Sequence, residues 1–192
     1  HKVGMVGVDA TAAVLEKAQQ RAECEGFANL LSFVQADVTA VPLPDNKFDF
    51  AWGEDAWCYV VDKDKLVAEA SRLVKKGGVV AFTDWIEGPK GLAEQEALRI
   101  NSFMKFPYME SLTGYIALMK KHGLEVVDAT DLTPEFAEYC DLYIGMVSKQ
   151  LTFDALKIIG FDFNMLSAIG AEMCFMRDCA KAGKMGRGRF VG

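Results

Sequence analysis

Short apolar runs alternate with segments of helical spacing through the first half of the chain. The runs at residues 3–8, 32–36, 48–52 and 79–83 have the length and composition of buried strands. Between the first two runs and between the last two, apolar residues recur at helical spacing: Val14, Leu15, Ala18 and Ala22, then Leu66, Val67, Ala70, Leu73 and Val74. The order strand, helix, strand, strand, helix, strand predicts a doubly wound α/β sheet.

Polar and glycine residues mark where these predicted helices begin and end. Thr11 is placed to cap the first helix, and Gly26 to end it. Asp62 and Asp64 open the second helix, and the pair Gly77-Gly78 is expected to stop it before the strand at 79–83.

The pattern becomes mainly helical after Pro89. Helical spacing predicts helices at about 91–104 and 112–122, and two long ones at 133–160 and 163–182. Strands are expected at 124–129 and 187–191. Because no repeat or linker interrupts the chain, we expect one domain over residues 1–192, with helical inserts within 89–183 that line a ligand pocket.

Composition narrows the function classes. A formal net charge of -6 and a pI near 5.0 argue against nucleic acid as a partner. Five cysteines without C-x-x-C spacing and only two histidines indicate reduced thiols and no metal site. No apolar run reaches the roughly 18–20 residues that span a bilayer, and no signal peptide pattern is visible. We therefore expect a cytoplasmic protein without a membrane partner.

Two acidic residues come directly after the first two predicted strands. Asp9 follows the run at 3–8, and Asp37 follows the run at 32–36. Ligands of parallel α/β sheets bind beyond the carboxyl ends of the strands, so two acceptors there suit a nucleoside: one for the ribose hydroxyls and one for an exocyclic amine. The alternative is that both aspartates only cap helices or turns.

The next segment carries a more specific signal. Asp37 leads into the turn-rich run 42–47 and then into Phe48-Asp49, and a helix and strand follow to Asp84. Together with Val6-Gly7-Val8-Asp9, this arrangement resembles the class I S-adenosylmethionine-dependent methyltransferases. Trp52–Ala56 and the terminal run 182–188 resemble the small-molecule branch, which includes sarcosine/dimethylglycine, ubiquinone/menaquinone and phosphoethanolamine methyltransferases.

The resemblance implies a Rossmann-like doubly wound sheet, mostly parallel with an antiparallel C-terminal strand, and S-adenosyl-L-methionine as cofactor. Asp9 would accept hydrogen bonds from the ribose hydroxyls, and Asp37 from the adenine amine. The remaining cofactor-binding residues that it implies are Ala10 and Thr11 beside the adenine, the Val38 amide at a ring nitrogen, and Trp52 and Gly53 near the methionine portion.

The methyl acceptor implied by the resemblance is a small molecule, foremost the nitrogen of a glycine-, sarcosine- or dimethylglycine-type amine. Glu54, Asp55 and Asp84 are the candidates for taking the acceptor's proton. The alternative acceptor is a quinone-like aromatic, methylated on carbon or oxygen, for which the Met- and Phe-rich helices beyond residue 100 would provide space. Those helices equally suit a core or a dimer face.

The family's glycine-rich loop and the strand before it have no counterpart ahead of Asp9. We therefore expect a fold with its first strand missing, an N-terminally truncated domain. A third hypothesis follows, that this form packs but does not bind cofactor alone. Open strand edges associate readily, so a homodimer or a strand-completing partner is expected.

Overall fold

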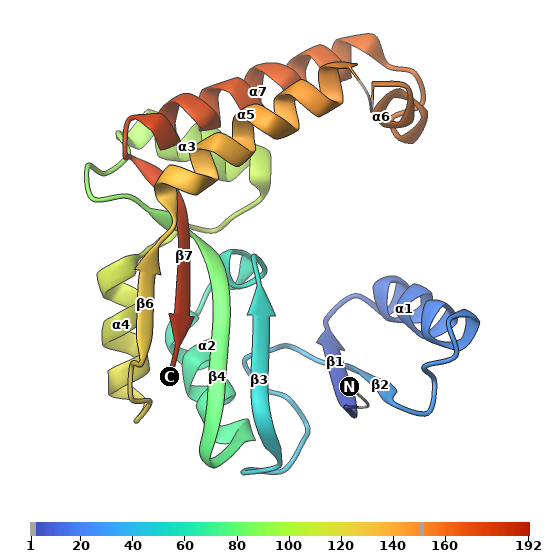
Figure 1. Cartoon of the computed structure of the whole chain (residues 1–192), viewed down its shortest axis with the longest axis vertical. Coiled ribbons are helices and arrows are strands. Elements are labelled where there is room, and N and C mark those ends of the chain that lie inside the picture. The colour runs from blue at the N-terminus through green and yellow to red at the C-terminus, as the bar shows by residue number, and fades with distance from the viewer. Residues whose placement is uncertain (1–2, 150–151) are drawn as a thin grey trace.

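Two separate sheets organise the chain in a computed structural model that describes residues 3–149 and 152–192. The first sheet pairs β1 (Met5–Asp9) with β2 (Leu31–Gln35) in parallel, and α1 (Ala12–Cys24) connects them. Figure 1 shows this unit to one side of the larger sheet, next to β3. The register sets Asp9 opposite Gln35, so both strands end at the same edge.

The second sheet has five strands in the order β3-β4-β7-β6, with β5 (Glu110–Ser111) also on β4. β3 (Phe48–Glu54) runs parallel to β4 (Val74–Glu87), whereas β7 (Met185–Val191) is antiparallel to β4 and to β6 (Asp128–Asp131). The predicted α/β class, with a mostly parallel arrangement and an antiparallel C-terminal strand, is confirmed.

The pleat of β4 divides the apolar interior into two clusters. Val80, Phe82 and Ile86 point to one face, where they pack against α2 (Lys63–Leu73) and α4 (Leu112–Lys121). Trp85 points to the other cluster, with side chains from α3 (Glu94–Met104), α5 (Thr133–Lys149) and α7 (Phe163–Lys181). Successive residues of a strand face opposite sides, so one strand supports both layers.

The helices α3, α5 and α7 lie together beyond the carboxyl ends of β3 and β4 (Figure 1). A 3₁₀ turn, η1 (Trp57–Tyr59), follows β3 at this edge, and α6 (Thr152–Ile158) stands at the far end of the helical layer. The sheet edge and the helical layer therefore face one another, in the region where the strand-end acids were predicted.

Several predicted boundaries are wrong. The helix predicted over 133–160 is two helices, α5 and α6, and its residues 150–151 lie outside the described residues. The strand expected at 124–129 is β6 at Asp128–Asp131, because the antiparallel pairing with β7 covers these four residues, next to a bond from the Val127 amide to the Val191 carbonyl. Gly77-Gly78 do not end α2, which stops at Leu73; they lie within β4, which is longer than predicted.

The N-terminal ends of the two connecting helices differ in how they are capped. The Asp62 carboxylate accepts a hydrogen bond from the Lys65 amide, as an N-cap should. Thr11 occupies the N-cap position of α1, but its side chain makes no capping bond. The Asp9 carboxylate instead accepts from the Thr11 amide at 2.7 Å, so the prediction for the Thr11 side chain is wrong.

Among the described residues, no single helix has the length and apolarity to cross a bilayer; α6 and α7 meet that criterion only when taken together, with a 115° bend between them.

One face of β3 carries exposed apolar side chains. Phe50 is 46% exposed and Trp52 60%, and their rings lie 5.8 Å apart. Within the described ranges, β1 and β3 each have one side without a hydrogen-bonded neighbour. Unpaired strand edges next to apolar side chains favour association with another chain.

We expect this protein to self-associate through that face, with a sedimentation coefficient that rises with protein concentration. Phe50→Lys should weaken the association by about tenfold or more, since burial of one large apolar side chain contributes roughly 1.5–3 kcal/mol. Val61→Lys is the matched control, because Val61 is 73% exposed and lies outside β3. A strictly monomeric species at every concentration in analytical ultracentrifugation contradicts the expectation.

Candidate functional site

Asp9 and Asp37 lie at the same edge of the first sheet. Asp9 ends β1, and Asp37 comes two residues after Gln35, the residue opposite Asp9. The Ala36 amide donates to the Asp9 carbonyl at 3.1 Å, and the Gln35 side chain donates to the Ala10 carbonyl at 3.1 Å. These bonds tie the two strand ends together, so the sequence-predicted acids are neighbours.

Each of these carboxylates uses one oxygen to fix its own turn. Asp9 Oδ1 accepts from the Thr11 amide, and Asp37 Oδ1 accepts from the amide and the hydroxyl of Thr39, both at 2.8 Å. The Thr39 bonds, the backbone one foremost, lower the pKa of Asp37 below its ordinary value. The second oxygen of each carboxylate accepts no hydrogen bond from the described residues, which leaves it available to a ligand donor.

The other residues predicted around the nucleoside surround these two acids. Ala10 and Thr11 are exposed at the start of α1, and Val38 is half-buried against the core of the larger sheet. The Val38 amide donates to no acceptor in the described part of the chain. This edge thus offers two carboxylate acceptors and one amide donor.

Gly53, near the end of β3, lies in close contact with the indole ring of Trp57. A Cβ on Gly53 would lie 2.3 Å from Trp57 Nε1, and the Trp57 ring is itself stacked on Phe82 at 3.8 Å. The missing side chain therefore lets η1 close against the strand. Trp52, by contrast, is exposed on the open face of β3.

An arginine that the sequence analysis did not single out organises the acids after β3. Arg187 on β7 donates from Nε to Asp55 at 2.9 Å and from a terminal nitrogen to the Thr83 hydroxyl at 3.0 Å. The same guanidinium lies 3.5 Å from Glu54. Asp55 has φ +49°, a left-handed conformation rare outside glycine, and its amide donates to the Thr83 carbonyl.

In the sequence, Arg187 is one of four basic residues near the C-terminus, a cluster that indicates either contact with an anion or a solvated chain end. The basic residues near the C-terminus belong to ion pairs: Lys181 with Asp141, Lys184 with Glu96, Arg187 with Asp55 and Arg189 with Asp128. Their acidic partners come from distant parts of the chain, so the sequence pattern gave no indication of the pairing.

Asp84 is fully buried beneath this edge. One carboxylate oxygen accepts from the Cys58 amide at 2.9 Å, and the other accepts from the Tyr115 hydroxyl at 2.6 Å. Burial raises the pKa of Asp84, and the two hydrogen bonds partly oppose that rise. Burial and the nearby Asp84 charge also raise the pKa of Tyr115 and of the Cys58 thiol.

Asp84 thus connects β4, η1 and α4 through hydrogen bonds. Lys63, also buried, donates to the Val60 and Tyr108 carbonyls and lies over the Tyr108 ring. These contacts support a positioning role for Asp84, whereas Glu54 and Asp55 lie nearer to solvent.

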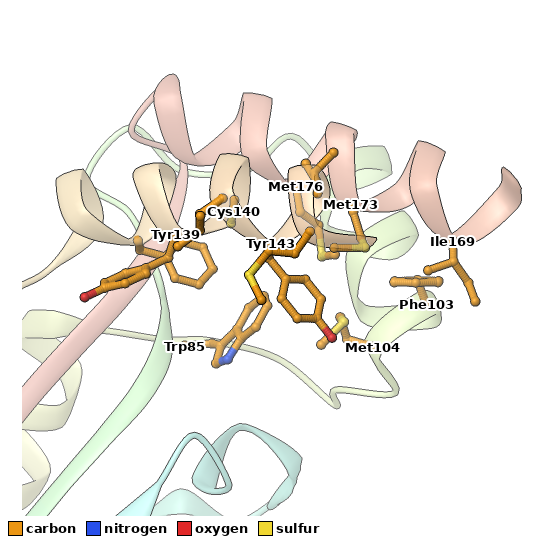
Figure 2. A pocket seen from close by; sticks show the side chains of 13 residues that line it. Trp85, Phe103, Met104, Tyr139, Cys140, Tyr143, Ile169, Met173 and Met176 are labelled. Atoms are coloured by element: carbon orange, nitrogen blue, oxygen red, sulfur yellow. The ribbon is translucent and has the colours of Figure 1, made fainter. Parts of the chain in front are cut away.

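A pocket of about 460 Å³ opens between the helical layer and the sheet edge. Figure 2 shows Trp85 of β4 on the side of the pocket that faces the sheet. Phe103 of α3 and Ile169 of α7 lie at the side of the pocket away from Trp85. The 13 lining residues share an apolar character, and none is Asp, Glu, Lys, Arg or His: Trp85, Phe103, Met104, Phe136, Tyr139, Cys140, Leu142, Tyr143, Ile144, Met146, Ile169, Met173 and Met176.

The Met-rich helices beyond residue 100 therefore contribute to a pocket as well as to a core. Met104, Met146 and Met173 line it, while Met109 is buried in the cluster below. Of the aromatic residues near the acids, Trp57 belongs to the core of the sheet, and Phe106 lies between Tyr59 and Trp85 in edge-to-face contact with both.

Comparison with known proteins places these features in context. Residues 3–82 match a protein family described as a methyltransferase domain. The chain is 28% identical over 139 residues to the sarcosine/dimethylglycine N-methyltransferase of Halorhodospira halochloris, covering 71% of this chain and 47% of the relative. It is 30% identical over 108 residues to the ubiquinone/menaquinone biosynthesis C-methyltransferase of Hahella chejuensis, covering 56% and 43%.

The fold likeness extends over more of the chain. The structure of Haemonchus contortus phosphoethanolamine N-methyltransferase 2 matches with a TM-score of 0.85 at 20% identity, covering 98% of this chain and 43% of that one. The chain spans about half the length of the first curated relatives that it matches, from 45% to 57%.

We expect Gly53→Ala to lower the free energy of unfolding by roughly 1–3 kcal/mol, since the new methyl group would displace the stacked Trp57 ring. Gly145→Ala is the control, because a Cβ at Gly145 in α5 meets no atom within 4 Å and alanine favours the helix. Urea denaturation measures both. Equal stability of the two variants would show that Gly53 does not accommodate Trp57.

Tyr115→Phe should lower the free energy of unfolding by about 1–3 kcal/mol, since it removes a donor from buried Asp84. The folded pKa of Asp84 lies above its ordinary value of 3.8, so the folded state binds this proton more tightly. The Asp84 contribution to stability is thus complete below pH 3.8 and is lost as pH rises through the folded pKa.

Loss of the Tyr115 bond raises that folded pKa further, so the stability difference between wild type and Tyr115→Phe should widen from pH 4.5 to pH 8. Tyr59→Phe, at an exposed tyrosine, serves as the control. Denaturation curves that give the same difference at both pH values contradict this assignment.

Proposed function

We propose that this chain, which belongs to the S-adenosylmethionine-dependent methyltransferases, binds S-adenosyl-L-methionine at Asp9 and Asp37 and takes part in methyl transfer to a small molecule. The observation that carries the proposal is the placement of two carboxylates at one edge of paired parallel strands, each with an oxygen left for a ligand.

The chemistry of this edge fits the nucleoside of the cofactor. Asp9 would accept from the ribose hydroxyls, and Asp37 from the adenine amine, while the Val38 amide would donate to a ring nitrogen. Charge-assisted hydrogen bonds of this kind are about twice as strong as neutral ones. The Asp37 carboxylate is ionised at neutral pH, and the Thr39 hydrogen bonds that lower its pKa favour the same charged form.

When bound, the cofactor supplies an electrophilic methyl group on sulfur, and the sulfur leaves as a neutral thioether. The protein's task is to align the acceptor atom with that methyl group and to exclude water, which can contribute on the order of 7–11 kcal/mol to lowering the barrier. Trp52 to Asp55 are the candidates for this task, because they lie at the end of β3, the strand that stands between the first sheet and β4 and points toward the helical layer (Figure 1).

The acceptor loses a proton when its new bond to carbon forms. Glu54 and Asp55 are the candidates to take it. Arg187 engages Asp55 closely, and Glu54 is 63% exposed with only a 3.5 Å contact to the same guanidinium. Glu54 is therefore the freer base, and Arg187 and Asp84 act as positioning residues.

Two acceptor classes fit the family. A glycine-type amine would rely on Glu54 and Asp55 for its charged groups. A quinone-like aromatic, methylated on carbon or oxygen, is favoured by the apolar lining of the adjoining pocket. We propose the second class for that reason.

Titration with S-adenosylhomocysteine tests the cofactor site. Asp9→Asn and Asp37→Asn should each weaken binding by roughly 10- to 100-fold, the equivalent of about 1.5–3 kcal/mol for a hydrogen bond to a charged group. Asparagine retains an oxygen for the turn amide, so the loops at Thr11 and Thr39 should persist.

Asp154→Asn on α6 is the control for a lost exposed carboxylate, and it should bind as the wild type does. Isothermal titration calorimetry measures all four proteins. Absence of binding heat with folded wild-type protein would favour the third hypothesis, a form that does not bind cofactor alone.

A further inference from the structure

We infer that the methyl acceptor is an uncharged molecule whose non-reacting part is a hydrocarbon body, held in the pocket between α3, α5 and α7 with its reacting end toward the carboxylates of Glu54 and Asp55 at the end of β3. This inference rests on the proposed function and names the substrate class of the same site. It is carried by the composition of the pocket and by the place of that pocket beside a charged cluster.

The register of β4 and β7 joins the two regions. Trp85 is the direct antiparallel partner of Arg187, so the two side chains leave the same face of the sheet side by side. The Trp85 indole contacts Phe106 and Phe136 edge-on, with ring centroids 5.5 Å and 4.9 Å away, and lines the pocket. Arg187 turns instead to Asp55 and Thr83.

The charged side chains next to the pocket form ion pairs with one another. Arg187 is engaged by Asp55 and approached by Glu54, and the pocket side contributes no further cation or anion. An amino-acid acceptor carries a carboxylate and an amine, and burial of such groups without charged partners is strongly unfavourable. The body of the acceptor in this pocket is therefore uncharged.

The kinds of side chain in the pocket also indicate the shape of the acceptor. The rings of Trp85 and Tyr143 lie toward the sheet, while Ile169 and Phe103 lie further out (Figure 2). The Phe136 ring packs edge-on against Trp85. Methionines such as Met104 and Met173 are flexible and make favourable contacts with rings. We expect a ring near Trp85 and an attached chain that extends between α5 and α7.

A series of 4-alkylphenols tests this inference without cofactor. Affinity should rise by about three- to fourfold for each added methylene until the pocket is filled, which is the increment expected for removing a methylene from water. Isothermal titration measures the series against sarcosine. An affinity that does not change with chain length, or tighter binding of sarcosine than of 4-butylphenol, overturns the inference.

Tyr143→Glu places a carboxylate at the lining of the pocket from a side chain that is already 56% exposed, so the fold should tolerate it. We expect it to reduce 4-butylphenol affinity by at least about tenfold and to flatten the dependence on chain length. The matched control is Phe153→Glu, at a 65% exposed aromatic outside the pocket lining, which should bind as the wild type does. Equal binding by the two variants overturns the inference.

A second variant, Met173→Trp, fills the pocket without adding charge and should shorten the longest alkyl chain that still gains affinity. Binding of S-adenosylhomocysteine, measured on the same proteins, separates the two claims. Cofactor binding without any gain along the alkyl series rejects the apolar acceptor alone. A gain along the series without cofactor binding rejects the proposed cofactor site and supports the pocket assignment.

Discussion

The pleat of β4 is the constraint on which the rest of the site depends. Asp84 and Trp85 are consecutive, so one must enter the sheet core while the other faces the helical layer. Asp84 receives the Cys58 amide and the Tyr115 hydroxyl, which fixes η1 and α4 against the strand. With that register set, Trp85 lies in the pocket beside Arg187.

The structure keeps the acidic strand ends apart from an apolar pocket lining. Carboxylates at Asp9 and Asp37 end one pair of strands, and the acids Glu54 and Asp55 with Arg187 occupy the end of β3. The helical layer opposite presents a lining without charged side chains. Such a division suits a reaction between a polar nucleoside cofactor and an apolar acceptor, because each partner is desolvated by groups of its own kind.

The sequence pattern predicted correctly those helices and strands that are determined by interactions between residues close together in the chain. Strand alternation and caps located β1, β2, β3 and α2, and parallel pairing of β1 with β2 follows from a connecting helix of ordinary length. The predicted bounds of strands and helices were wrong where pairing with a strand distant in the chain determines them. β6 is Asp128–Asp131 because these residues pair with β7, although Leu124 and Val126 pack against the core with the alternation of a strand. Gly77 and Gly78 lie in the part of β4 where its register with β3 shifts, between the pairs Phe48–Val74 and Phe50–Val79, and the partner strand β3 is distant in the chain.

By itself, the sequence determined the fold class, the two strand-end aspartates and the family they indicate, because strand periodicity and turn chemistry act within a few residues. Only the tertiary structure decided that Arg187 pairs with Asp55 across 132 positions, that Asp84 is buried rather than facing the open edge, and that side chains from β4, α3, α5 and α7 enclose an apolar pocket. These features depend on contacts between residues far apart in the chain, which the local pattern of a single sequence does not encode.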